Sequence, residues 1–167
     1  MSYVAEWDKY LPTFRRLILL RESSGNYQVI NSIGYVGGYQ FGTLALQDLG
    51  LVKKGIGSSN SLLLDADNWT GKDGIKSLDD FLSNPSYQDE CFDRYSIINR
   101  KRLYKFGVID LDTSIEDVMG FVAASHLVGA GGVKVNGLDS VDANNTKARE
   151  YFDLVRNGII NDERYYD

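Results

Sequence analysis

The sequence contains few of the residues that define several other protein classes. Of its 167 residues, one is cysteine, one is histidine and two are proline. A single cysteine, Cys91, cannot form an internal disulfide, so the fold must depend on its packed core. One histidine and one cysteine do not supply the ligand set of a zinc site. We therefore expect neither a metal nor another cofactor.

An excess of basic residues is also missing. The chain has 18 Lys and Arg against 23 Asp and Glu, which gives a formal net charge of −5. Nucleic-acid-binding domains carry a basic surface, so DNA and RNA are not expected partners. The first eight residues lack a basic segment followed by an apolar run, and no stretch approaches the length of a membrane span. We expect synthesis in the cytoplasm without a signal peptide, and no membrane partner.

The residues that are abundant suit a helical domain. Hydrophobic residues make up 43% of the chain and charged residues 25%, as in ordinary globular proteins. The length fits a single domain over residues 1–167, with a polar C-terminal tail from about residue 161. Apolar spacing and capping residues predict helices over about 12–22, 43–49, 77–82, 85–105, 114–128 and 146–155.

Residues 27–41 do not have helical periodicity. Two short apolar pairs, at 29–30 and 35–36, flank the turn-forming sequence Asn-Ser-Ile-Gly. Such a pattern indicates a small irregular β-hairpin. Residues 53–76 are rich in Gly, Ser, Asn and Asp and indicate a long loop. The predicted fold class is therefore mainly α with a small β-hairpin (α+β).

Glu22 is the most informative single residue. It lies one turn beyond Ile18 on the face that also carries Phe14, so the helix that buries those side chains should half-bury its carboxyl group. Burial disfavours the charged form of a carboxyl, and a protonated glutamate can donate its proton to a glycosidic oxygen. From periodicity alone, a glutamate in the last turn of a helix is usually a solvated side chain.

Two motifs surround this glutamate. The stretch RESSGNY at 21–27 is followed by GYVGGYQFG at 34–42. Together they resemble the first two motifs of lytic transglycosylases and goose-type lysozymes, in which a Glu-Ser pair ends a helix and a glycine-rich segment closes on Gln. The resemblance implies a lysozyme-like fold with Glu22 as the acid. It also implies a sugar groove lined by Ser23, Tyr35, Tyr39 and Gln40, where glycine at 37 and 38 lets the backbone approach the substrate.

A third motif is similar to the same family only in part. The stretch ASHLVGAG at 124–131 aligns with the family's Ala-x-Tyr-Asn-Ala-Gly-x-Gly, which ends a helix beside the active site. His126 stands at the tyrosine position, which implies a role in positioning the acid or the substrate. Leu127 stands at the asparagine position and lacks its amide. A Ser-His-Asp site that uses His126 stays open, although no nucleophile-elbow motif supports it.

The resemblance implies a peptidoglycan glycosidase, either a muramidase or a lytic transglycosylase. Such an enzyme cleaves the β-1,4 bond between N-acetylmuramic acid and N-acetylglucosamine. Asp65 and Asp67 are candidates for a second carboxylate that holds water in an inverting hydrolase, but a role as turn-forming residues is favoured over this one. Two alternatives remain: a glycan-binding module without turnover, and a chitin-type glycoside hydrolase.

The expected partner is the peptidoglycan glycan strand. A wall-cutting enzyme without a signal peptide fits delivery to the periplasm or the cell exterior by a phage or by a secretion system. The sequence leaves the delivery machinery open, together with any inhibitor or immunity protein.

Overall fold

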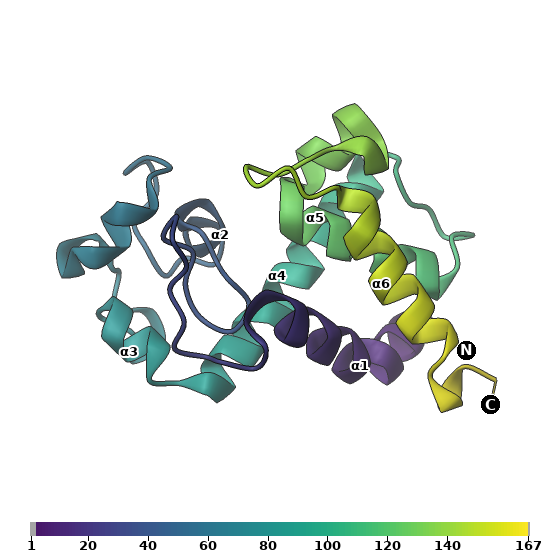
Figure 1. Cartoon of the computed structure of the whole chain (residues 1–167), viewed down its shortest axis with the longest axis horizontal. Helices are drawn as coiled ribbons and strands as arrows, with labels where there is room; N and C mark the ends of the chain where they lie inside the picture. Colours follow the sequence, from purple (N-terminus) through teal and green to yellow (C-terminus); the bar gives the residue numbers. More distant parts are fainter. Residues whose placement is uncertain (1–2, 167) are drawn as a thin grey trace. The chain divides into compact units, whose positions relative to one another are not determined.

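The computed structural model describes residues 3–166, and every regular element in that range is helical (Figure 1). The α-helices are α1 (Tyr3–Ser23), α2 (Thr43–Asp48), α3 (Leu78–Leu82), α4 (Pro85–Lys105), α5 (Ile115–Asn136) and α6 (Ala148–Ile160). The short 3-10 helices are η1 (Asn60–Leu64), η2 (Ala66–Asn68), η3 (Lys72–Gly74), η4 (Gly137–Asp139) and η5 (Glu163–Tyr166).

The predicted α+β class with a β-hairpin at 27–41 is wrong, because residues 3–166 contain no strand. Val36 makes isolated antiparallel bridges to Ile30 and to Phe41, and neither bridge extends into a ladder. The backbone turns too often for a hairpin: Gly34, Gly37 and Gln40 all have positive φ angles. Each of these residues bends the chain out of the extended region that a ladder requires.

The helix predictions are closer to the structure. α4 has the predicted bounds, and α3 begins after Ser77, whose side chain accepts a hydrogen bond from the amide of Asp80. α1 begins at Tyr3 rather than near Pro12, so the proline lies inside the helix. A proline inside a helix removes a backbone hydrogen bond, at a cost of about 3 kcal/mol. Burial of apolar side chains along the whole helix offsets that cost: Trp7, Tyr10, Phe14 and Ile18.

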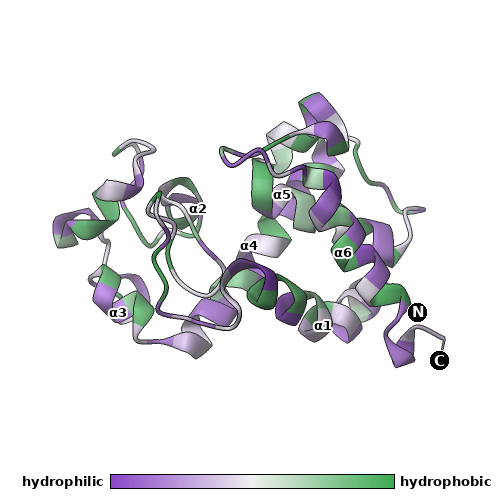
Figure 2. Cartoon of the chain, viewed as in Figure 1, coloured by the Kyte–Doolittle hydropathy of each residue, from purple (hydrophilic) through white to green (hydrophobic). Residues whose placement is uncertain are grey.

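The chain divides into two compact units. The first, which we call the helical unit, comprises Met1–Ile18 and Ser96–Asp167. Its core is built from helix faces, and α5 lies against α6, where a Cβ atom on Gly120 would come within 2.6 Å of the Phe152 ring. Figure 2 shows hydrophilic and hydrophobic residues alternating along α6, and its buried residues recur every three or four positions: Ala148, Tyr151, Val155 and Ile159.

The C-terminal residues belong to the helical unit. The Thr13 hydroxyl donates to the Asp162 carboxylate over 2.6 Å, and Arg164 donates to the same carboxylate over 2.7 Å. The Tyr165 hydroxyl donates to Glu116 near the start of α5 over 2.9 Å. The predicted polar tail therefore bonds to α1 and α5 through its side chains.

The second unit, which we call the loop-rich unit, comprises Leu19–Tyr95. Only short helices, the end of α1 and the first half of α4 lie in it. Its core is aromatic: Tyr39, Phe41, Phe81 and Phe92 are each at most 1% exposed. Side chains satisfy much of its loop backbone. Asn60 bonds the amide of Thr43 and the carbonyl of Ile33, and the Trp69 ring nitrogen donates to Leu63.

The segment Ile115–Asp139, which contains α5, is long and apolar enough to cross a bilayer by length and composition. The prediction that no stretch reaches that length is wrong by this measure. Half of the segment is buried against the rest of the protein, as in the core helix of a globular domain.

Candidate functional site

Glu22 lies in the last turn of α1, within the loop-rich unit. It is half-buried, because it follows the fully buried Ile18 and the half-buried Leu19 by one helical turn. Ser24 has a positive φ of 55° and ends the helix, and its amide still bonds the carbonyl of Leu20. Glu22 thus stands as a half-buried residue in the final turn before the helix ends.

The Gly37–Gly38 pair packs directly against that helix end. A Cβ atom on Gly38 would lie 2.6 Å from Cδ1 of Leu19 and 3.0 Å from Cδ1 of Tyr27. A Cβ atom on Gly37 would lie 2.5 Å from Oε1 of Gln88. The sequence predicted that these glycines make room for a substrate. The structure shows instead that they make room for the protein's own side chains.

Gln88 on α4 holds this turn in place. Its side chain is fully buried, and its Oε1 accepts the amide of Gly38 over 2.9 Å. Its Nε2 donates to the carbonyls of Tyr27 and Phe81, each over 3.0 Å. Sequence reasoning missed Gln88, although a glutamine on the apolar stripe of α4 was a usable signal.

A second group on α4 binds two tyrosines of the motif region. Oδ1 of Asp89 accepts hydrogen bonds from the hydroxyls of Tyr39 (2.5 Å) and Tyr27 (2.8 Å). Burial, together with the bond to Asp89, raises the pKa of Tyr39 far above its usual value of 10. The Tyr39 ring stacks on Phe92 at 4.6 Å and is 0% exposed. Tyr39 is therefore a core residue here, and its ring faces are covered by protein.

The other predicted groove residues make local contacts. The Ser23 hydroxyl donates to the carbonyl of Leu19, its own helix neighbour. Nε2 of Gln40 donates to the carbonyl of Gly37 over 2.9 Å, within its own turn. Tyr35 is half-buried, and its ring fills the space in front of Gly42. Gln40 and Tyr35 therefore stabilise the conformation of their own glycine-rich segment, residues 34–42.

Asp65 and Asp67 lie elsewhere in the loop-rich unit. The Asp65 carboxylate accepts the amide of Asp67 over 2.9 Å and caps η2, and both residues are exposed. These contacts are those of turn-forming residues. No group of three His, Cys, Asp or Glu side chains that could hold a metal ion occurs among the described residues.

His126 belongs to the helical unit, on α5. It is half-buried, and the helix continues past it to a kink at Gly129, where φ is 78° and ψ is 154°. The third motif thus does end a regular helical stretch, as the glycines predict.

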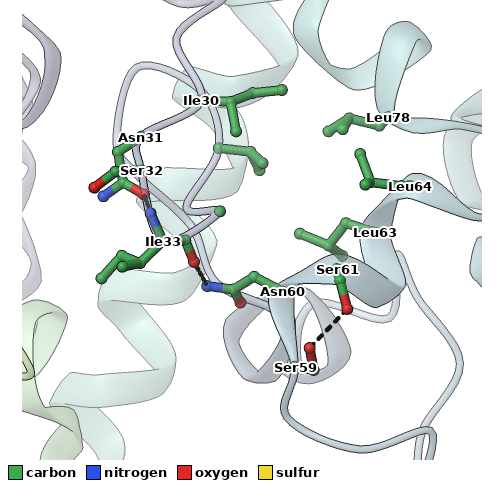
Figure 3. Close-up of a pocket in the computed structure, with 12 residues that line it drawn as sticks. Ile30, Asn31, Ser32, Ile33, Ser59, Asn60, Ser61, Leu63, Leu64 and Leu78 are labelled. Atoms are coloured by element: carbon green, nitrogen blue, oxygen red, sulfur yellow. Dashed lines mark hydrogen bonds between the residues drawn. The ribbon is translucent and has the colours of Figure 1, made fainter.

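A pocket of about 400 Å³ opens in the loop-rich unit, between the 30–36 loop and η1. Figure 3 shows Ile30 on one side and Leu63, Leu64 and Leu78 on the other. At its rim the Ser59 and Ser61 hydroxyls share a hydrogen bond of 2.8 Å. Neither Glu22 nor Gln40 lines this pocket, so it is separate from the predicted site.

The candidate site therefore combines a half-buried carboxyl group in the last turn of α1 with a glycine turn that packs on Leu19 of the same helix. Gln88 bonds this turn, and Asp89 bonds two tyrosines of the same region. A carboxyl group in this setting can give a proton to a bound oxygen and take one back. Comparisons of the chain with protein-family models, with curated proteins and with solved structures yield no match.

Proposed function

We propose that the chain is a peptidoglycan glycosidase in which Glu22 is the general acid. One observation carries the proposal: Gly38, from the Gly-Gly-Tyr-Gln motif, packs on Leu19, one turn before Glu22. Gly38 also packs on Tyr27, so the two motifs that resemble those of lytic transglycosylases and goose-type lysozymes are in contact. Glu22 is also half-buried, as expected for a carboxyl group that lines a binding groove.

In the proposed reaction Glu22 donates its proton to the oxygen of the β-1,4 bond as that bond breaks. The N-acetylmuramic acid side develops oxocarbenium character and is then attacked by an oxygen nucleophile. Glu22, now a carboxylate, takes the proton of the nucleophile, which restores its starting state. Attack by water gives a hydrolysed product, and attack by the sugar's own C6 hydroxyl gives an anhydro product that needs no second carboxylate.

The test is the clearing of a suspension of purified peptidoglycan. We expect the intact protein to clear it and Glu22→Gln to be slower by about 100-fold or more, the range for loss of a general acid. Glu90→Gln is the matched control, since Glu90 is an exposed glutamate on α4 and should leave clearing unchanged. Equal clearing by the intact protein and Glu22→Gln would refute the role of Glu22.

Two rival functions give other outcomes in the same experiment. A glycan-binding module would sediment with peptidoglycan without clearing it. Leu127, at the position where the family has asparagine in the third motif, favours this rival. A chitin-type hydrolase would leave peptidoglycan intact and cleave N-acetylglucosamine polymers. Mass spectrometry of the released fragments would separate an anhydro-forming enzyme from a hydrolytic one.

A further inference from the structure

Tyr27 and Asp89 form a polar pair that the proposed chemistry does not use. Both side chains are half-buried, and the Tyr27 hydroxyl donates to Oδ1 of Asp89 over 2.8 Å. Tyr39 donates to the same oxygen from inside the core. Two phenols thus fix one carboxylate oxygen, while Oδ2 accepts no hydrogen bond from the part of the chain that the structure describes.

We propose that Tyr27 and Asp89 form a binding subsite for a neutral sugar, namely the N-acetylglucosamine unit of the glycan. The choice of a wall glycan rests on the proposed function. A carboxylate held by two phenols has a fixed orientation, so little side-chain entropy is lost when a ligand binds to its second oxygen. The geometry therefore suits ligand binding as well as packing.

The chemistry of the pair selects the ligand. The Tyr27 proton is committed to Asp89, and a carboxylate has none to offer, so the pair presents acceptors. Its ligand must supply donors, which the hydroxyl groups and the acetamido N–H of a sugar provide. The Tyr27 ring meets Tyr39 edge-on, with centroids 6.2 Å apart, and Tyr27 is only half-buried. Aromatic side chains also pack against the C–H groups of sugars.

The two sugars of peptidoglycan differ in charge. N-acetylmuramic acid carries a lactyl group that is ionised or bonded to a peptide with further carboxylates. The negative charge of Asp89 repels such groups at close range and does not repel the uncharged N-acetylglucosamine. The subsite should therefore prefer the sugar that lacks a carboxylate.

The subsite is continuous with the candidate site around Glu22. Cδ1 of Tyr27 lies against Gly38, and Gly38 lies against Leu19 in the last turn of α1. Gln88 bonds both the Tyr27 carbonyl and the Gly38 amide, so one buried side chain fixes the backbone at both residues. The glycine turn of the second motif therefore helps to position Tyr27, one of the two subsite residues.

The experiment measures binding of the N-acetylglucosamine trimer by NMR, in a Glu22→Gln background that prevents cleavage. The backbone amides of Gly38 and Asp89 report occupancy at this place. We expect Asp89→Asn to weaken binding about tenfold, as for loss of one hydrogen bond to a charged group. Its melting temperature should stay nearly the same, because the Asn carbonyl oxygen can still accept both phenols. Glu90→Gln, the neighbouring exposed carboxylate, is the matched control and should bind as tightly as the background protein.

Three results would overturn the subsite: absence of trimer-induced shifts at Gly38 and Asp89, equal binding by Asp89→Asn and the background protein, or tighter binding of a muramic-acid-containing disaccharide than of di-N-acetylglucosamine. A loss of melting temperature in Asp89→Asn without a change in affinity would show that Asp89 only holds the two tyrosines. The readout is independent of turnover. If the intact protein does not clear peptidoglycan but the trimer still binds at Gly38 and Asp89, only the proposed function is refuted. If the intact protein clears peptidoglycan but the trimer does not bind there, only the subsite is refuted.

Discussion

The two units are held together by different interactions. In the helical unit long helices satisfy their own backbone, and close packing of α5 on α6 sets the structure. In the loop-rich unit few residues lie in long helices, so buried side chains such as Gln88 and Trp69 bond the backbone of the loops. The helical unit should therefore be sensitive to side-chain volume, and the loop-rich unit to loss of single polar groups.

Each unit carries one tryptophan, so the comparison can be tested unit by unit. Trp7 lies in the helical unit and Trp69 in the loop-rich unit, and both are at most 5% exposed. In a Trp7→Phe background the fluorescence of Trp69 follows urea unfolding of the loop-rich unit, and the reverse background follows the helical unit.

The largest effect is expected for Gln88→Leu. The substitution introduces an apolar side chain of similar size, which leaves the Gly38 amide and two carbonyls without partners. We expect the free energy of unfolding reported by Trp69 to fall by about 3 kcal/mol. Gln28→Leu, at an exposed position, is the control and should change it by less than about 0.5 kcal/mol. A small effect at Gln88 would contradict the view that polar side chains hold this unit.

A pair of glycine substitutions in α5 tests the sensitivity of the helical unit to volume. Gly120→Ala places a methyl group against Phe152 and should destabilise the unit by about 2 kcal/mol, as followed by Trp7. Gly131→Ala has no atom within 4 Å of the new Cβ and should stabilise the helix by about 0.5 kcal/mol. Equal effects of the two substitutions would show that packing between α5 and α6 does not limit stability.

The smallest effect is expected for the C-terminal ion pair. Hydrogen bonds from Arg164 and Thr13 lower the pKa of Asp162 below its ordinary value of 3.8. A lowered folded-state pKa contributes stability that is present above pH 4 and is lost as the pH falls further toward the folded-state value. Asp162→Asn should cost at most about 1 kcal/mol at pH 7, and less at pH 3. A cost that does not shrink between these pH values, measured by urea unfolding, would exclude an ionic contribution.

Some of the structure follows from local sequence. The apolar spacing and helix-ending residues of 85–105 predict α4 with its bounds, and spacing along α1 predicts a half-buried Glu22. The hairpin prediction failed because apolar pairs around a turn are compatible both with isolated β-bridges and with the continuous ladder of a hairpin. The positive φ angles of Gly34, Gly37 and Gln40, which break the ladder, depend on packing that no short window of sequence contains.

Local sequence is enough to place Glu22 at a helix end and to show that a glycine-rich, glutamine-containing segment follows it. The contacts of that segment depend on the folded chain, because Gln88 and Asp89 reach it from α4, about fifty positions along the chain. A hydrogen bond between residues so far apart leaves no periodic pattern in the sequence. It exists only where folding has closed the loop and removed water from both partners.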